Sequence, residues 1–61
     1  MTWTAKWGDY TFTINEVDGR FDLHVDHFYA NDHGLWFRSY KSARDFLRKE
    51  YGFSGRMDKS A

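Results

Sequence analysis

The first 28 residues of this chain alternate between apolar and polar side chains, which is the pattern of β-strands that bury one face. Three alternating runs, over residues 2–7, 10–16 and 20–26, are separated by Gly8-Asp9 and by Asp18-Gly19. Gly-Asp suits a type II′ turn and Asp-Gly a type I′ turn, and both turns join antiparallel strands through two residues. The pattern therefore predicts a three-stranded antiparallel meander.

Two-residue turns at these positions also predict which side chains lie opposite each other. The first turn places Ala5 opposite Phe12, and the second places Phe12 opposite Val25. Ile14 gains apolar neighbours on both sides in the same way, from Trp3 and Leu23. A slip of one residue would move every apolar side chain to the other face. Turn chemistry and alternation thus predict the same register independently.

The rest of the chain predicts a loop, a short strand and a helix. Residues 29–34 are polar and indicate a loop, and residues 35–38 suit a fourth strand with Trp36 and Arg38 pointing outward. The helix that follows has candidate N-caps at Ser39 and Ser42, and Gly52 suits its C-terminal end. Its apolar side chains recur at helical spacing, at Ala43, Phe46, Leu47 and Tyr51.

These elements predict a single small α+β domain over residues 1–53, with residues 54–61 as a flexible polar tail. The sheet has three or four antiparallel strands, and the C-terminal helix packs on its apolar face. In outline the layout resembles the strand–strand–strand–helix DNA-binding modules such as integrase arm-binding domains, over the meander and residues 37–51. Those modules read DNA with basic and aromatic residues on the open sheet face. Here that face carries Asp22 and Asp26, so no family is assigned.

Composition narrows the classes of protein to which the chain can belong. The absence of cysteine excludes disulfides, thiolate metal sites and cysteine nucleophiles, while aromatic residues make up 21% of the chain and can supply the core. No apolar run is long enough to span a membrane. The first residues also lack the basic-then-apolar layout of a signal peptide. We therefore expect a cytoplasmic protein with no membrane contact.

Side chains able to bind a metal or transfer protons gather in one region, but their spacing argues against both roles. They are Asp22, His24, Asp26, His27, Asp32 and His33. The alternate residues of a strand lie about 6.6 Å apart, so the first three do not converge on one ion. A domain of this size also has little room for a pocket of about 300 Å³ or more. We expect no metal, no cofactor and no enzymatic activity.

The charges divide along the chain, and this division suggests a binding function. Residues 1–34 carry six acidic against two basic side chains, and residues 35–61 carry seven basic against three acidic ones. With a helix over one sheet face, the two signs are expected on opposite sides of the molecule. The leading hypothesis is a non-enzymatic protein that binds a macromolecular partner and inhibits or modulates it by occlusion.

Residues of the open sheet face and its edge are the candidate protein-binding site. They are Asp22, His24, Asp26, Trp36 and Arg38. Small phage-encoded inhibitors and nucleic-acid mimics work in this way, which is an analogy of class only. Trp36 could alternatively anchor a homodimer, because tryptophan is common among interface hot spots.

The alternative hypothesis is a nucleic-acid-binding protein that uses the basic side of the helix. The candidate residues are Tyr40, Lys41, Arg44, Arg48 and Lys49. Three of the cations recur at helical spacing, and the tyrosine can stack on a base. Against this, Asp45 has the spacing to pair with Lys41 and Lys49, and the sequence pI of 6.8 is low for a DNA-binding domain.

Overall fold

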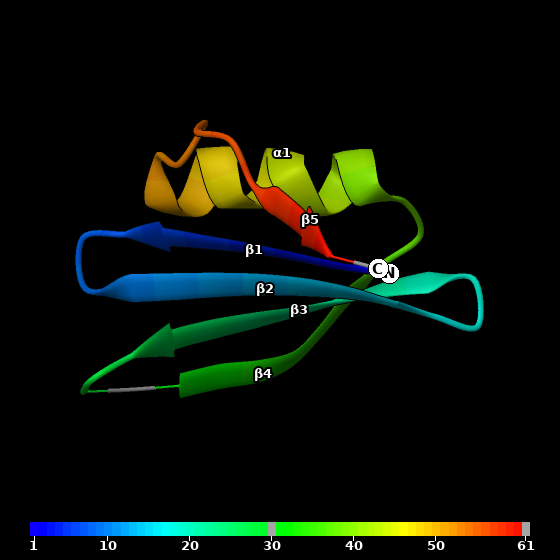
Figure 1. Cartoon of the computed structure of the whole chain (residues 1–61), viewed down its shortest axis with the longest axis horizontal. Helices are drawn as coiled ribbons and strands as arrows, with labels where there is room; N and C mark the ends of the chain where they lie inside the picture. Colours follow the sequence, from blue (N-terminus) through cyan, green and yellow to red (C-terminus); the bar gives the residue numbers. More distant parts are fainter. Residues whose placement is uncertain (30, 61) are drawn as a thin grey trace.

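The computed structural model describes residues 1–29 and 31–60, and it shows an antiparallel sheet of five strands with one helix packed against it (Figure 1). In chain order the elements are β1 (Thr2–Trp7), β2 (Tyr10–Val17), β3 (Arg20–His27), β4 (Asn31–Phe37), α1 (Tyr40–Tyr51) and β5 (Asp58–Ser60). The strands lie side by side in the order β4-β3-β2-β1-β5. The predicted α+β class is confirmed, with a wider sheet than expected.

Both tight turns adopt the backbone conformations that their residues favour. Asp18 and Gly19 have φ angles of 51° and 81°, as a type I′ turn requires, and Gly8 has a φ of 62°. The resulting register places Ala5 opposite Phe12 and Phe12 opposite Val25. The predicted pairing of the first three strands is therefore confirmed residue by residue.

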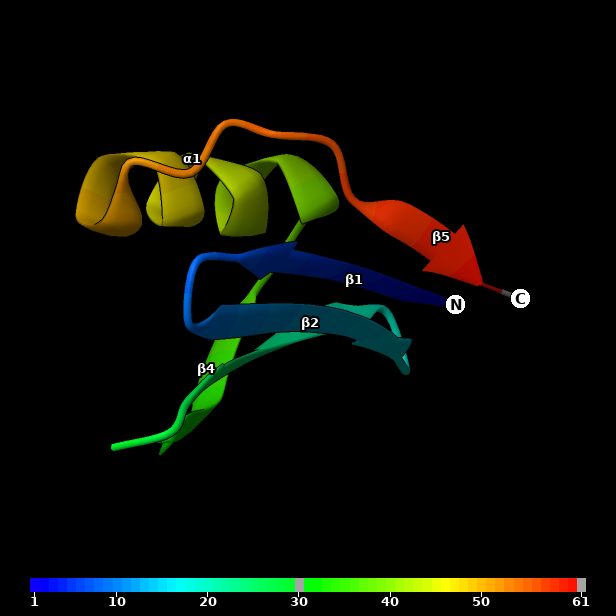
Figure 2. The same ribbon diagram turned by 60° about the vertical axis from the view of Figure 1, so that its left-hand side comes forward.

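One face of the sheet and the helix enclose the core. Figures 1 and 2 show α1 lying along one side of the sheet, which we call the helix side; the other side is the open face. The buried core side chains are Ala5, Phe12, Ile14, Leu23, Val25, Ala43, Leu47, Phe53 and Met57. Complete burial of a large apolar side chain is worth about 1.5–3 kcal/mol. The core thus joins all three central strands to the helix and to the C-terminal segment.

The helix begins and ends at residues that satisfy its unpaired backbone groups. Ser39 is the N-cap, because its Oγ accepts a hydrogen bond of 3.1 Å from the backbone N–H of Ser42. Gly52 follows the last turn with a φ of 74°, and its N–H donates to the carbonyl of Arg48 at 3.0 Å. The structure thus selects Ser39 from the two candidate N-caps and confirms the predicted helix end.

Strand β4 is longer than the sequence pattern predicts. The expected loop over residues 29–34 is wrong for residues 31–34, which belong to the strand, while residue 30 lies outside the described residues. Leu35 lies opposite Leu23 and Asp32 opposite Val25, so two residues of β4, His33 and Gly34, face one residue of β3. This extra residue is a β-bulge.

The bulge explains why the sequence pattern hid the strand. Gly34 has a φ of 107°, a backbone conformation that residues with a Cβ rarely adopt. Beyond it the alternation changes phase, so Asp32 and Leu35 lie on the same side of the sheet although they are three residues apart. A strand without regular alternation resembles a polar loop in sequence.

The C-terminal segment is part of the domain, which corrects the prediction of a flexible tail over residues 54–61 and of a domain ending at residue 53. Met57 is only 6% exposed, and β5 pairs with β1 through Thr2 opposite Ser60. A single apolar residue among polar ones gives no periodicity, so the sequence did not indicate this strand. Pairing with the edge of β1 and the burial of Met57 in the core hold it in place. Residue 61 lies outside the described residues.

We predict that Met57→Ala lowers the free energy of unfolding by about 2–3 kcal/mol, because it leaves a cavity between the C-terminal segment and the core. Urea denaturation followed by tryptophan fluorescence measures the loss. Ser54→Ala, in an exposed part of the same segment, serves as the control and should change stability by less than about 0.5 kcal/mol. Equal stability of both variants would show that the segment does not contribute to the core.

Candidate functional site

The open face carries a continuous polar surface across the strands. Its side chains come from alternate positions that lie opposite one another, including Thr4, Lys6, Thr11, Thr13, Asn15, Asp22, His24, Asp26, Asn31 and Trp36. No described element of the chain covers this side of the sheet. Three of the predicted site residues, Asp22, His24 and Asp26, are brought together here on β3, as expected.

Two histidines and a carboxylate form a contiguous group on this face. The His33 ring stacks on the His24 ring, with centroids 4.4 Å apart and an angle of 23° between the planes. The Nε2 atom of His33 lies 2.7 Å from Oδ1 of Asp26. His33 reaches this position because the bulge in β4 places it on the open face beside β3. The group therefore depends on the bulge that the sequence pattern did not reveal.

An exposed indole ring lies next to a second carboxylate. Trp36 is opposite Asp22 across β4 and β3, and 56% of Trp36 is exposed to solvent. Nε of Arg20 lies 3.1 Å from Oδ1 of Asp22, which is itself partly buried. Trp36 thus points outward as predicted, and it is a large apolar side chain exposed on this surface. Arg38, which follows β4, is exposed.

The residues considered above as metal ligands do not converge on one point. Within residues 1–29 and 31–60, no three histidine, aspartate or glutamate side chains are grouped as the ligands of an ion. His24 and His33 contact each other through their ring faces, and Asp26 interacts with His33. Asp32 lies on the helix side with Val25, away from the others.

The basic helix surface is partly neutralised by Asp45. Lys41 Nζ lies 3.1 Å from one carboxylate oxygen of Asp45, and Arg48 lies 3.2 Å from the other. Lys49 is exposed, but its expected partnership with Asp45 is replaced by that of Arg48. A small cavity of about 140 Å³ nearby is lined in part by the same Asp45, which disfavours an anion there.

Arg44 serves the fold rather than the surface. Its guanidinium donates to the Tyr40 hydroxyl at 3.1 Å and to the carbonyl of Gly55. It also lies over the Phe53 ring, 5.6 Å from the centroid, and its Nε is buried. Arg44 and Tyr40 therefore hold the C-terminal segment against the helix. The nucleic-acid hypothesis counts both as surface residues, and in the structure both are partly buried and take part in these contacts.

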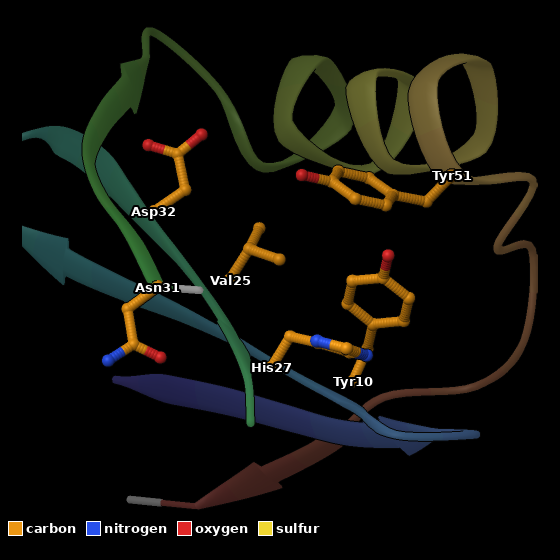
Figure 3. A pocket seen from close by; sticks show the side chains of 6 residues that line it. All are labelled: Tyr10, Val25, His27, Asn31, Asp32 and Tyr51. Atoms are coloured by element: carbon orange, nitrogen blue, oxygen red, sulfur yellow. The ribbon is translucent and has the colours of Figure 1, made fainter. Parts of the chain in front are cut away.

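A pocket that the sequence reasoning missed opens on the helix side. Figure 3 shows its lining, and its volume is about 270 Å³. The residues that line it come from three strands and the helix: Tyr10, Val25, His27, Asn31, Asp32 and Tyr51. One signal was present, because the register set by the Asp18-Gly19 turn also places Tyr10 opposite His27. The contributions of Asp32 and Tyr51 depend on the bulge and on helix packing.

The pocket changes the chemistry of the tyrosine that closes it. Burial raises the pKa of Tyr51, and the negative charge of Asp32 raises it further, with smaller contributions from Tyr10 and Glu50. In Figure 3 the Tyr51 hydroxyl points toward the strand that carries Asp32. Phenolate formation is therefore disfavoured in the folded chain.

Comparisons with protein-family models, with curated protein sequences and with solved structures found no significant match to this chain. Among the described residues, no helix is both long and apolar enough to cross a membrane.

We predict that in Tyr51→Phe the free energy of unfolding falls less steeply as the pH rises above 9. Because the pKa of Tyr51 is raised by folding, its stabilising contribution is complete below the unfolded value of about 10 and is lost as pH rises through the folded value. Urea denaturation at several pH values above 9 measures the slope. Absorbance at 295 nm identifies the Tyr51 phenolate by difference. An identical slope in the variant would contradict the raised pKa.

Proposed function

We propose that this chain is a non-enzymatic binding protein that docks its open face on a basic surface of a protein partner and modulates that partner by occlusion. The observation that carries the proposal is the exposed Trp36 beside Asp22 on a sheet face that no described element covers. An aromatic anchor within a polar surround is the usual composition of a protein interface.

The carboxylates of this face are held in place. Arg20 contacts one oxygen of Asp22, and His33 contacts one oxygen of Asp26. An ionised carboxylate has about four acceptor sites, so Asp22 retains room for an arginine or lysine of a partner. Such contacts fix orientation and raise the association rate. A basic partner with an apolar recess for the indole ring fits this surface.

The molecule is large enough for such an interface. A typical stable interface covers about 800 Å² on each partner, which is roughly a fifth of the 4339 Å² that this chain exposes. One face of the sheet in a domain this small has an area of that order. Binding through the open face would therefore cover a comparable area of the partner, which is the basis of action by occlusion.

The nucleic-acid hypothesis has less support from the geometry. Of its five residues, Arg44 and Tyr40 are used within the fold, and Lys41 and Arg48 share Asp45. Only Lys49 of that group is an exposed cation outside these contacts. Salt-dependent binding of nucleic acid would therefore contradict the proposal.

We predict that Trp36→Ala weakens binding to the partner about thirtyfold, the effect of losing a hot spot of about 2 kcal/mol. The partner is first isolated from a source-cell lysate with the tagged chain and identified by quantitative mass spectrometry. Binding of the purified partner is then measured by calorimetry. Asp22→Asn with Asp26→Asn should lower the association rate and its salt dependence.

Arg56→Ala is the matched control, because Arg56 is exposed on the C-terminal segment and outside the open face. It should leave the affinity unchanged, and all variants should keep the thermal stability of the parent. Unchanged binding after Trp36→Ala would overturn the proposal. So would salt-dependent binding of random duplex DNA that is lost in the double variant Lys41→Ala, Lys49→Ala.

A further inference from the structure

The pocket on the helix side has aromatic walls. The Tyr10 and Tyr51 rings meet edge to face, with centroids 5.3 Å apart and an angle of 64°. The His27 ring lies 4.7 Å from the Tyr10 ring, and Val25 also lines the pocket, as Figure 3 shows. Three rings from β2, β3 and α1 therefore line one small cavity.

One of the lining residues is an acid whose charge is not neutralised within the described chain. Asp32 makes no hydrogen bond or ion pair with any other described residue, in contrast to Asp22, Asp26 and Asp45. Its charge acts on the pocket, because it is one of the causes that disfavour the phenolate of Tyr51. With Gly34 present in β4, the bulge is what keeps Asp32 on this side of the sheet.

The third ring of the pocket is held by a hydrogen bond to the backbone. Nδ1 of His27 accepts a hydrogen bond of 3.3 Å from the backbone N–H of Tyr29. The pocket thus combines three aromatic rings with one carboxylate.

We propose that this pocket binds an organic cation: an alkylammonium or guanidinium group. The faces of aromatic rings attract cations, and a nearby carboxylate adds a charge of the required sign. The volume of about 270 Å³ suits one head group or side-chain end rather than a larger ligand. An anion would be repelled by Asp32, and a neutral molecule would gain only apolar contact.

The surroundings of the pocket suit a cation carried on a longer chain. Phe28 and Tyr29 follow His27 and are 71% and 82% exposed, with their rings 4.0 Å apart. The Phe28 ring lies 5.2 Å from the His27 ring. These exposed rings extend the aromatic surface outward from the pocket wall. They would contact the aliphatic part of a lysine, an arginine or a free amine whose charged end is in the pocket.

This inference does not rest on the function proposed above. The pocket lies on the helix side of the sheet, and none of its contacts with the cation involves Trp36, Asp22 or Asp26. Failure of either proposal leaves the other intact. The pocket can be tested with small molecules and the isolated chain, without knowledge of a partner.

The test is an NMR titration with choline chloride, followed through the side-chain signals of His27, Tyr10 and Tyr51. We expect saturable shifts that are localised to these rings. The uncharged isostere 3,3-dimethyl-1-butanol has the same shape and should bind at least fivefold more weakly. Asp32→Asn should weaken choline binding at least fivefold, whereas Asp18→Asn removes a charge at a distant turn and should have no effect.

Two further arms distinguish the sources of the cation. Capped amides of lysine, trimethyllysine and arginine represent a partner's side chain, and choline represents a free alkylammonium compound. Saturable binding in either arm supports the proposal, and the tighter arm identifies the source. Equal shifts with the neutral isostere, equal choline affinity of Asp32→Asn, or shifts no larger than those of sodium chloride at equal ionic strength would overturn it. Amide spectra of each variant verify that it is folded.

Discussion

The register of three strands, set by two tight turns, is the constraint on which the rest of the structure depends. Because side chains alternate across a sheet, this register decides that Phe12 and Ile14 face the helix, and it also decides that Asp22 and Asp26 face solvent. The same pairing that builds the core therefore builds the candidate site. Because the chain has no cysteine, no disulfide can hold the core and the candidate site together in place of this strand pairing.

The parts of the fold that could be predicted from sequence are those determined by neighbouring residues. Asp18-Gly19 specifies its turn locally, and Ser39 and Gly52 specify helix ends locally, so each was recognisable. Strand β5 and the β4 bulge depend on partners distant in sequence. Met57 has no apolar neighbours along the chain that would indicate a strand, and it is buried in a core formed by residues distant from it in sequence. Local patterns contain no information of that kind.

The candidate site was predictable to the same extent. Asp22, His24, Asp26 and Trp36 lie on the open face because alternation alone determines their side. The acidic and basic halves of the sequence do not separate completely onto opposite sides of the folded molecule. Arg20 lies beside Asp22 on the open face, and Asp32 lies on the helix side. The sequence prediction for the basic helix surface took no account of tertiary contacts made by its side chains. A linear spacing cannot show that Arg44 binds the carbonyl of Gly55.

The bulge at Gly34 has an evolutionary consequence. Loss of this one codon would leave a regular ladder in which Asp32 still lies opposite Val25 and His33 opposite His24, so both surfaces would survive. Replacement of Gly34 is the more disruptive change, although a Cβ there would meet no neighbour within 4 Å, because its φ of 107° is strained for other residues. If the substituted chain relieved this strain by adopting regular strand alternation, the side chains of residues 31–33 would move to the opposite sides of the sheet. The sides of the sheet that Asp32 and His33 occupy thus depend on the residue that stands at position 34.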